Sequence, residues 1–369
     1  MGSAAAMHLA RRGKRVMVLD RFGVAHDHGS SHGITRIIRL AYFEHPSYVP
    51  LLRRAFELWR DLEVDAGEPL LHVTGSIDAG PADSRTFAGS LHSCETHELA
   101  HQVLESAALS LRFPGFQLPA SYLGVFQPDG GFLVPERCIT AHIALARAAG
   151  ADVRAHEGAI DWEAEPGGSV TVETDLGTYE ADQLVFACGA WAGQLVPALG
   201  GLLVPERQVL GWFDIADRDA FAPARFPVFN LDFDGEHWYG FPEFGVPGFK
   251  IGCYHHRRER VDPETFDRAH VGRADISLLR SCVETCFPAA NGDVLMTKTC
   301  LFTNTPDEDF IIDRLPAAPQ VLIVSPCSGH GFKFASVIGE IVADLVTTGA
   351  TRHDISRHRL SRFPGLRGL

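Results

Sequence analysis

The chain has no excess of basic residues, no long apolar run and no regular spacing of cysteines. Its 46 aspartates and glutamates outnumber its 33 lysines and arginines, giving a net charge of −13. An acidic surface repels phosphate backbones and anionic lipids, so we expect neither nucleic acid nor membrane as a partner. An anionic small substrate would therefore need a local cationic pocket.

Targeting and metal-binding signals are also absent from the sequence. No segment approaches the roughly 20 apolar residues of a membrane helix, and no basic stretch before an apolar core marks a signal peptide. The eight cysteines lack the spacing of a disulfide framework, which predicts reduced thiols and a cytoplasmic protein. Cys282 and Cys286 could share a helix face, but no nearby His or Cys group completes a zinc set. We therefore predict no metal site.

Several segments carry clear secondary-structure patterns. Apolar residues recur at three- and four-residue steps in 48–62, which predicts a helix. Segments 135–150 and 334–349 are also predicted helices, since proline begins the first and glycine ends both. A buried strand is predicted at 320–326, and alternating aromatics and turns predict a mostly antiparallel sheet over 204–300.

The length of 369 residues favours two domains. Strand and helix signals at both ends and in the middle predict an α/β (α+β) fold with a Rossmann-like domain built from separated segments. A mostly antiparallel β-sheet domain would be inserted between them. We expect segments 1–72, 133–203 and 308–369 to form the Rossmann-like domain, and 73–132 and 204–307 the second domain.

The first twenty residues have the pattern of the second half of a nucleotide-binding βαβ unit. A helix is predicted over 4–10 and a strand over 16–19, with Gly13 between them. Gly2 would let the helix N-terminus approach a pyrophosphate, and Asp20, eighteen residues later, suits a ribose hydroxyl. For this stretch alone, a plain scaffold helix is the commoner interpretation.

Cationic residues recur in two apolar contexts. In "SSHGITRIIRLAYFEH" (30–45), Arg36 and Arg39 would share a face if the segment is helical and could then bind a carboxylate, but two solvated arginines fit equally well. In "GFKIGCYHH", Lys250 lies between two apolar residues. A desolvated lysine tends to be functional, whereas an outward lysine on an edge strand is commoner.

Two C-terminal stretches complete the candidate site. "TCLFTNTPDEDFIIDRLP" predicts a loop that leads into a buried strand, and Cys300 within it would most often be a small buried hydrophobe. In "SGHGFK", the glycines on either side of His330 would permit close backbone approach to a ligand. Lys333 follows in the first turn of the last predicted helix.

Together, "HGITRIIRLAY", "ACGAW", "YGFPEFG", "CLFTNTPDEDFIIDRLP" and "SGHGFKFASVIGEI" resemble the monomeric sarcosine oxidase and N-methyl-tryptophan oxidase family of flavoproteins. This family lies within the D-amino-acid-oxidase-like fold group, and the resemblance spans almost the whole chain. It implies a monomer that uses FAD to oxidise a secondary amino acid with O2 as electron acceptor. The products would be hydrogen peroxide and an imine, which hydrolyses to an amino acid plus formaldehyde when the substituent is N-methyl.

The resemblance also implies roles for matching residues. Cys300 matches the cysteine bonded through sulfur to the 8α-methyl of FAD. Arg39 and Lys333 match the pair that clamps the substrate carboxylate, and Lys250 matches the lysine that promotes oxygen reduction. Arg36 and His255 match catalytic residues beside the flavin, His255 across an apparent one-residue insertion near Cys253. Tyr239 and His330 match residues of the substrate pocket. The residues that fall in cofactor-binding segments are Gly2, Asp20, Ser30, Ser31, Arg36, Ala190, Trp191, Gly329, Gly331, Phe332 and Lys333.

Two departures from the family pattern leave alternatives open. Phe302 stands where relatives often have tyrosine, and Met1 matches the residue just before the third glycine of the phosphate loop. We therefore expect the natural protein to begin about 10–15 residues upstream, the length of a strand plus a turn. The alternatives are an oxidase of cyclic imino acids such as pipecolate or proline, an oxidase of larger amines, and a truncated, non-catalytic relative.

Overall fold

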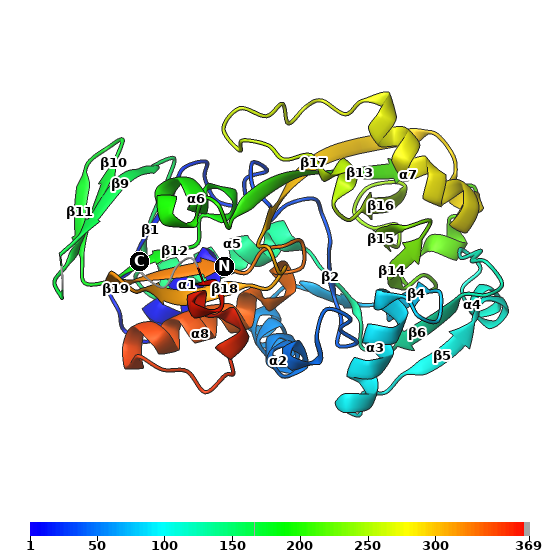
Figure 1. The fold of residues 1–369 in the computed structure, drawn as a ribbon, viewed down its shortest axis with the longest axis horizontal. Helices are drawn as coiled ribbons and strands as arrows, with labels where there is room; N and C mark the ends of the chain where they lie inside the picture. The colour runs from blue at the N-terminus through cyan, green and yellow to red at the C-terminus, as the bar shows by residue number, and fades with distance from the viewer. Residues whose placement is uncertain (166, 365–369) are drawn as a thin grey trace.

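Helices and strands alternate along the described residues, 1–165 and 167–364, of this computed structural model (Figure 1). Residues 166 and 365–369, which belong to the expected segments 133–203 and 308–369, lie outside the described residues. The α-helices are α1 (Gly2–Arg11), α2 (Val49–Ala66), α3 (Arg85–Thr96), α4 (Ser106–Arg112), α5 (Pro135–Ala148), α6 (Ala192–Leu195), α7 (Arg273–Cys286) and α8 (Ala335–Thr348). Among the described residues, none of these helices is long and apolar enough to cross a membrane.

The strands form five sheets. They are β1 (Met17–Asp20), β2 (Arg36–Ile38), β3 (Leu71–Val73), β4 (Ser76–Gly80), β5 (Gln102–Glu105), β6 (Leu123–Gln127), β7 (Gly131–Leu133), β8 (Asp152–Ala155), β9 (Ala159–Ala164), β10 (Val170–Thr174), β11 (Thr178–Ala181), β12 (Leu184–Phe186), β13 (Val204–Phe213), β14 (Val228–Phe233), β15 (Glu236–Phe241), β16 (Phe249–Cys253), β17 (Val294–Asn304), β18 (Ile311–Leu315) and β19 (Ala318–Ser325). The α/β class predicted from the sequence is confirmed.

The predicted helices are confirmed as α1, α2, α5 and α8. Glycine ends α2 and α8 because Gly67 and Gly349 adopt left-handed backbone conformations, with φ of 67° and 78°. Parallel pairs of short strands lie beside these helices, β1 with β8 and β12 with β19. Such pairing is typical of α/β folds whose strands are covered by helices.

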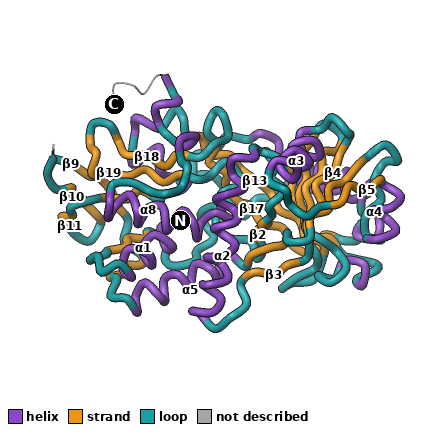
Figure 2. Tube along the Cα trace, turned by 90° about the horizontal axis from the view of Figure 1, so that it is seen from below, coloured by secondary structure: helices purple, strands orange, loops and turns teal. Residues whose placement is uncertain are grey.

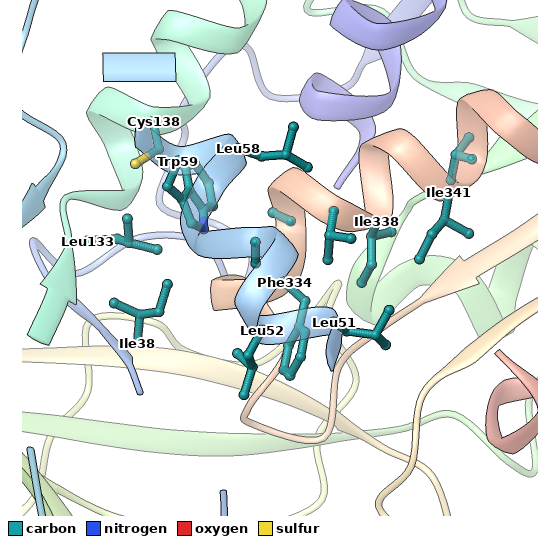
Figure 3. Packing of buried hydrophobic residues seen from close by; sticks show 14 of the residues in the cluster. Ile38, Leu51, Leu52, Leu58, Trp59, Leu133, Cys138, Phe334, Ile338 and Ile341 are labelled. Atoms are coloured by element: carbon teal, nitrogen blue, oxygen red, sulfur yellow. The ribbon is translucent and has the colours of Figure 1, made fainter. Parts of the chain in front are cut away.

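Helix α2 forms the centre of the helical core. Figure 3 shows Trp59 and Leu52 of α2 beside Phe334 and Ile338 of the chain segment that leads into and forms α8, with Cys138 of α5 close by. All five side chains are buried. The Trp59 indole also donates a 2.8 Å hydrogen bond from Nε1 to the backbone oxygen of Lys333. This bond fixes the turn before α8 to the core.

The largest sheet has eight strands in the order β17-β13-β16-β15-β14-β4-β6-β5. All neighbouring strands are antiparallel except β14 and β4, so the predicted mostly antiparallel sheet is confirmed. Figure 2 shows β4 and β5 at one end of the molecule and α1 and α8 toward the other. The expected domain boundaries remain a prediction.

Alternation along these strands gives the large sheet two different faces. Phe229 and Leu231 of β14 and Trp238 of β15 belong to an apolar cluster that includes α7. Asn230 and Tyr239 lie between these positions, and as a cross-strand pair they share the opposite face. Helix α7 also buries its cysteines against the apolar face, and the described residues hold no metal-binding group of three or more His, Cys, Asp or Glu.

The structure decides one open question of local structure and corrects one expectation, that of a loop at Cys300. The segment that begins at Arg36 is the strand β2, because Ile37 pairs with Phe132 of β7, so the helical arrangement considered for Arg36 and Arg39 does not form. Cys300 lies within β17, where it pairs with Gln208 of β13, and not in a loop. Both segments therefore depend on partners that are distant in the sequence.

Helices α1 and α8 approach each other closely at Gly339. A Cβ atom placed there would lie 2.7 Å from the Ala4 Cβ and 2.9 Å from the Ala4 backbone oxygen. We expect Gly339→Ala to lower the free energy of unfolding by about 1–3 kcal/mol, although alanine ordinarily favours a helix by roughly 1 kcal/mol. Urea unfolding would measure the change. Gly201→Ala, whose added Cβ would have no neighbour within 4 Å, is the control; equal stability of the two variants would contradict the close contact.

Candidate active site

A pocket lies over the polar face of the large sheet. Its floor comes from the sheet, and its walls come from the segment after β2, from Tyr254 and from the turn before α8. The residues lining it are Arg36, Ile37, Arg39, Phe43, Glu44, Leu210, Asn230, His237, Tyr239, Phe241, Tyr254, Cys300, Phe302, Gly329, His330, Phe332 and Lys333. Eight of the predicted site residues are thus brought together: Arg36, Arg39, Tyr239, Cys300, Gly329, His330, Phe332 and Lys333.

Cross-strand register explains the composition of the floor. Directly paired residues share a face of a sheet, and Tyr239 pairs with both Asn230 and Gly252. Lys250 pairs with Phe241 and with Trp212, which places its side chain on this same face. The sheet therefore presents polar and aromatic side chains toward the pocket while its other face stays apolar.

Arg39 is buried at one end of the pocket, with 2% of its surface exposed. Its Nη2 donates to both carboxylate oxygens of Glu44, at 3.0 and 2.8 Å, and its Nη1 donates to the backbone oxygen of Ala41. The guanidinium carbon lies 4.5 Å from the Tyr42 ring centre and 4.4 Å from that of Phe43. This pairing holds the guanidinium in one orientation.

The charges of this cluster are strongly coupled. Burial alone would raise the pKa of Glu44, but Arg39, with His330 and Lys333, lowers it to about 2. Burial, together with the nearby Arg39 charge, lowers the pKa of Lys333 to about 7. Two cationic side chains thus lie close together, and two buried carboxylates, Glu44 and Asp78, lie beside Arg39.

The turn that carries Lys333 depends on two glycines. Gly329 has φ of 77°, and a Cβ there would lie 2.5 Å from the Phe302 ring, while a Cβ at Gly331 would lie 1.5 Å from the backbone oxygen of Pro326. Both glycines thus allow close approach to protein atoms. The expected approach of this turn to a ligand stays a prediction. The Nδ1 atom of His330 lies 2.6 Å from the Tyr42 hydroxyl, within hydrogen-bond distance. Burial lowers the pKa of His330 to about 4.

Cys300 and Arg36 meet at the other end of the pocket. The Arg36 Nη2 lies 3.5 Å from the Cys300 sulfur and 2.8 Å from the backbone oxygen of Ser30. Cys300 is 4% exposed. The Cys300 thiol and the Arg36 guanidinium are therefore in contact within the pocket.

Lys250 lies below this end of the pocket and is buried. Its ammonium donates to the backbone oxygens of Gly33 and Thr35, at 2.7 and 2.9 Å, and to the Thr35 hydroxyl at 2.8 Å. The Phe241 ring centre lies 4.1 Å from Nζ. Burial, and next the Arg36 charge, lower the pKa of Lys250 well below its usual range. The inward orientation considered for this residue is therefore the one observed.

His255 lies behind the pocket wall, not in it. Its ring nitrogens contact Glu206 at 2.9 Å and Glu308 at 3.0 Å, and its ring packs edge-on against Tyr254. Burial disfavours the charged form, but the two carboxylates raise the pKa of His255 to about 9. Tyr254, the preceding residue, lines the pocket instead. The predicted position of His255 beside the flavin stays a prediction.

The remaining predicted cofactor residues lie outside the pocket lining. Gly2 begins α1, and Asp20 ends β1, where its Oδ1 accepts bonds from the backbone nitrogens of Phe22 and Gly23 at 3.0 and 2.9 Å. Ser30 and Ser31 lie in the loop between β1 and β2. Ala190 and Trp191 form a short 3₁₀ helix with Gly189 after β12.

Sequence reasoning missed four polar lining residues: Glu44, Asn230, His237 and Tyr254. Glu44 stands five residues after Arg39 and pairs with it, which its charge could have indicated. Asn230 alternates with Phe229 and Leu231, so the polar position in "FNLDF" was a signal for a face that is not part of the core.

Comparison with known proteins identifies relatives over the whole fold. A family described as FAD dependent oxidoreductase matches residues 1–345. Monomeric sarcosine oxidase of Streptomyces avermitilis is 41% identical over 361 residues, covering 96% of this chain and 93% of the relative. Monomeric sarcosine oxidase of Bacillus sp. (strain NS-129) is 39% identical, covering 98% and 94%. N-methyl-L-tryptophan oxidase of Salmonella typhi is 36% identical, covering 98% and 96%.

Solved structures share the architecture. NikD, described as an unusual amino acid oxidase essential for nikkomycin biosynthesis, superposes with a TM-score of 0.82 at 27% identity, covering 97% of this chain and 94% of NikD. L-proline dehydrogenase from P. horikoshii has a TM-score of 0.83 at 22% identity, covering 98% and 94%. The similarity to L-proline dehydrogenase, at 22% identity, shows the fold alone.

The charged His255 predicts a pH-dependent contribution to stability. Because its folded pKa of about 9 lies above the usual 6.5, this contribution is complete below about pH 6.5 and is lost as the pH rises to about 9. We expect His255→Gln to lower the free energy of unfolding by roughly 1–3 kcal/mol at pH 6 and by much less at pH 9.5. Urea unfolding at both pH values, with the exposed His92→Gln as control, measures this. A penalty independent of pH would show that the imidazolium is not stabilised by Glu206 and Glu308.

Proposed function

The chain belongs to the FAD dependent oxidoreductase family, and we propose that it oxidises N-methyl amino acids such as sarcosine or N-methyl-tryptophan. One observation carries the proposal: Arg39 and Lys333, two buried cations, line the same pocket as Cys300 and an aromatic wall. The relatives named for these two substrates, each more than a third identical over nearly the full length, support it.

The residues present suit FAD in several respects. The Ser30 hydroxyl is buried without a hydrogen-bond partner in the described part of the chain, and the backbone nitrogens at the start of α1 favour an anionic group. When bound, FAD supplies the acceptor for the hydride equivalent that leaves the amine carbon. The residues proposed to hold it are Gly2, Asp20, Ser30, Ser31, Arg36, Ala190, Trp191, Cys300, Gly329, Gly331, Phe332 and Lys333.

Arg39 and Lys333 would bind the substrate carboxylate. Glu44 orients the Arg39 guanidinium by accepting from its Nη2, and the Lys333 ammonium is held by the backbone oxygen of His330 at 2.8 Å. An arginine that is already oriented loses little freedom on binding, so the amine carbon is positioned at low entropic cost. Tyr239 and His330 would line the space around the bound amino acid.

Lys250 and Arg36 would act on the oxygen side of the reaction. A buried ammonium stabilises the negative charge that develops when oxygen is reduced, and burial strengthens this interaction. Lys250 is held by three acceptors from Gly33 and Thr35, which fixes its position below the pocket. The proposed partners are a small amino acid substrate and O2. We also propose that the protein is a monomer.

A peroxide assay across four substrates tests the proposed function. Sarcosine and N-methyl-L-tryptophan are expected to yield peroxide with kcat/KM at least tenfold above that for pipecolate or proline, a ratio that corresponds to about 1.4 kcal/mol. Preference for the cyclic substrates would reassign the enzyme to imino acids. A yellow holoprotein that produces no peroxide with any of the four would overturn the proposal.

Cys300 is proposed to hold the flavin through its sulfur, because its thiol lies in the pocket beside the Arg36 guanidinium. We expect acid-precipitated wild-type protein to stay yellow and acid-precipitated Cys300→Ser to be colourless. Cys253→Ser, on the opposite face of the same sheet, is the matched control and should stay yellow. A yellow Cys300→Ser pellet would place the attachment elsewhere.

Lys250→Met should slow the oxygen half-reaction by about 10²–10³-fold, because it removes the buried positive charge. Flavin reduction by substrate should change far less. Stopped-flow absorbance measures the two half-reactions separately under anaerobic and aerobic conditions. Lys14→Met, at an exposed position beyond α1, is the control. Comparable slowing of both half-reactions would contradict the assignment.

A further inference from the structure

Two hydrogen-bonding side chains interrupt the aromatic floor of the pocket. Asn230 lies on β14 and His237 on β15, and both line the pocket with Tyr239 and Phe241. Asn230 pairs directly with Tyr239, and Asp232 pairs with His237. Asn230 and His237 are therefore diagonal neighbours on one face of the sheet, about 7–8 Å apart between Cα atoms.

A buried carboxylate fixes the orientation of the Asn230 amide. Its Nδ2 donates a 2.6 Å hydrogen bond to Oδ1 of Asp78, which is the register partner of Asn230 on β4. Asp78 is fully buried and also accepts a 2.8 Å bond from the Ser90 hydroxyl. Because a carboxylate can only accept, the amide nitrogen must face Asp78. No described residue donates a hydrogen bond to the Oδ1 atom of Asn230, so this atom can accept one from a ligand.

A second carboxylate fixes His237 in the same way. The His237 Nδ1 lies 2.7 Å from Oδ1 of Asp232 and 3.1 Å from the Thr86 hydroxyl. Asp232 is held in turn by the Thr86 backbone nitrogen, which donates to its Oδ2 at 3.0 Å. The carboxylate accepts, so the Nδ1 proton points at it. Nε2 bonds to no side chain of the described chain, and the tautomer with its proton on Nδ1 presents Nε2 as an acceptor.

Both acceptor atoms belong to residues that line the pocket, where a ligand can reach them. Burying polar groups is favourable only when their hydrogen bonds are complete, and an apolar wall of the same shape would pack without that requirement. Asp78 orients Asn230 and Asp232 orients His237. In each case one atom of the oriented side chain has no hydrogen-bond partner among the described residues. A further positive charge on the substrate side chain is disfavoured, because Arg36, Arg39 and Lys333 already line the pocket.

We propose that Asn230 and His237 form a specificity subsite for a neutral hydrogen-bond donor on the substrate side chain, such as a carboxamide or a hydroxyl. The inference rests on the proposed function, in which Arg39 and Lys333 bind the carboxylate of the same substrate. A site that hydrogen-bonds its substrate rejects the analogue without the donor, because its own buried polar atoms are then left unpaired. Among N-methyl amino acids that carry a side chain, the subsite thus favours those whose side chain has a neutral hydrogen-bond donor.

The test compares N-methyl-L-asparagine with N-methyl-L-leucine, which has a similar shape and no donor. We expect the holoenzyme to favour the asparagine derivative by about tenfold or more in kcat/KM. Asn230→Leu and His237→Phe should each reduce that ratio by about tenfold, and His92→Phe, on the exposed side of α3, should leave it unchanged. The ratio within each variant is the readout, so a general loss of activity does not imitate the effect.

The outcomes separate the inference from the proposed function. Oxidation of sarcosine together with equal or better oxidation of the leucine derivative by the wild type would overturn the subsite and leave the proposed function standing. A wild-type preference that neither variant reduces would also overturn it. Failure to oxidise any N-methyl amino acid would overturn both. If one variant does not fold, the wild-type ratio and the other variant still decide.

Discussion

The pairing of the buried Arg39 guanidinium with Glu44 organises the pocket. Taking a charge out of water costs several kcal/mol unless close partners replace its hydration. Arg39 meets this requirement with a carboxylate, the backbone oxygen of Ala41 and two aromatic faces. The positive charge can therefore stay buried within an acidic protein, and the turn that carries Lys333 brings a second cation beside it. An anionic substrate of an acidic protein needs a local cationic pocket, and Arg39 and Lys333 form one.

The large sheet separates packing from chemistry by simple alternation. Phe229 and Leu231 stabilise the core beneath α7, while Asn230, between them, lines the pocket. The register between paired strands decides which residues share a face. The pairings β13–β17, β13–β16 and β15–β16 therefore place Cys300, Lys250 and Tyr239 on the same face of the sheet. The sheet thus supplies a rigid floor, and the more irregular segments after β2 and before α8 complete the site.

Local patterns in the sequence predicted four of the eight α-helices that the structure describes, and they predicted the site unevenly. Proline, glycine and three- to four-residue periodicity are local signals, so α2, α5 and α8 could be placed from them. The two isoleucines of β2 fit a helix or a strand, and only the pairing of Ile37 with Phe132, far along the chain, decides between them. Arg39, Lys333 and Cys300 were found through family motifs, since their spacing alone left other interpretations open. Asn230 and His237 were missed because their role depends on which strands are neighbours, whereas the charge of Glu44, five residues after Arg39, was a local signal.

The hydrogen bond from Trp59 to Lys333 uses the backbone oxygen of the lysine and does not involve its side chain. The tryptophan therefore anchors the turn whatever residue stands at position 333. During divergence, the charge presented there could change while the loop keeps its path, so new ligand preferences could arise without a new fold. Position 59 has no such freedom, since losing the indole would release the main chain that every variant at 333 depends on.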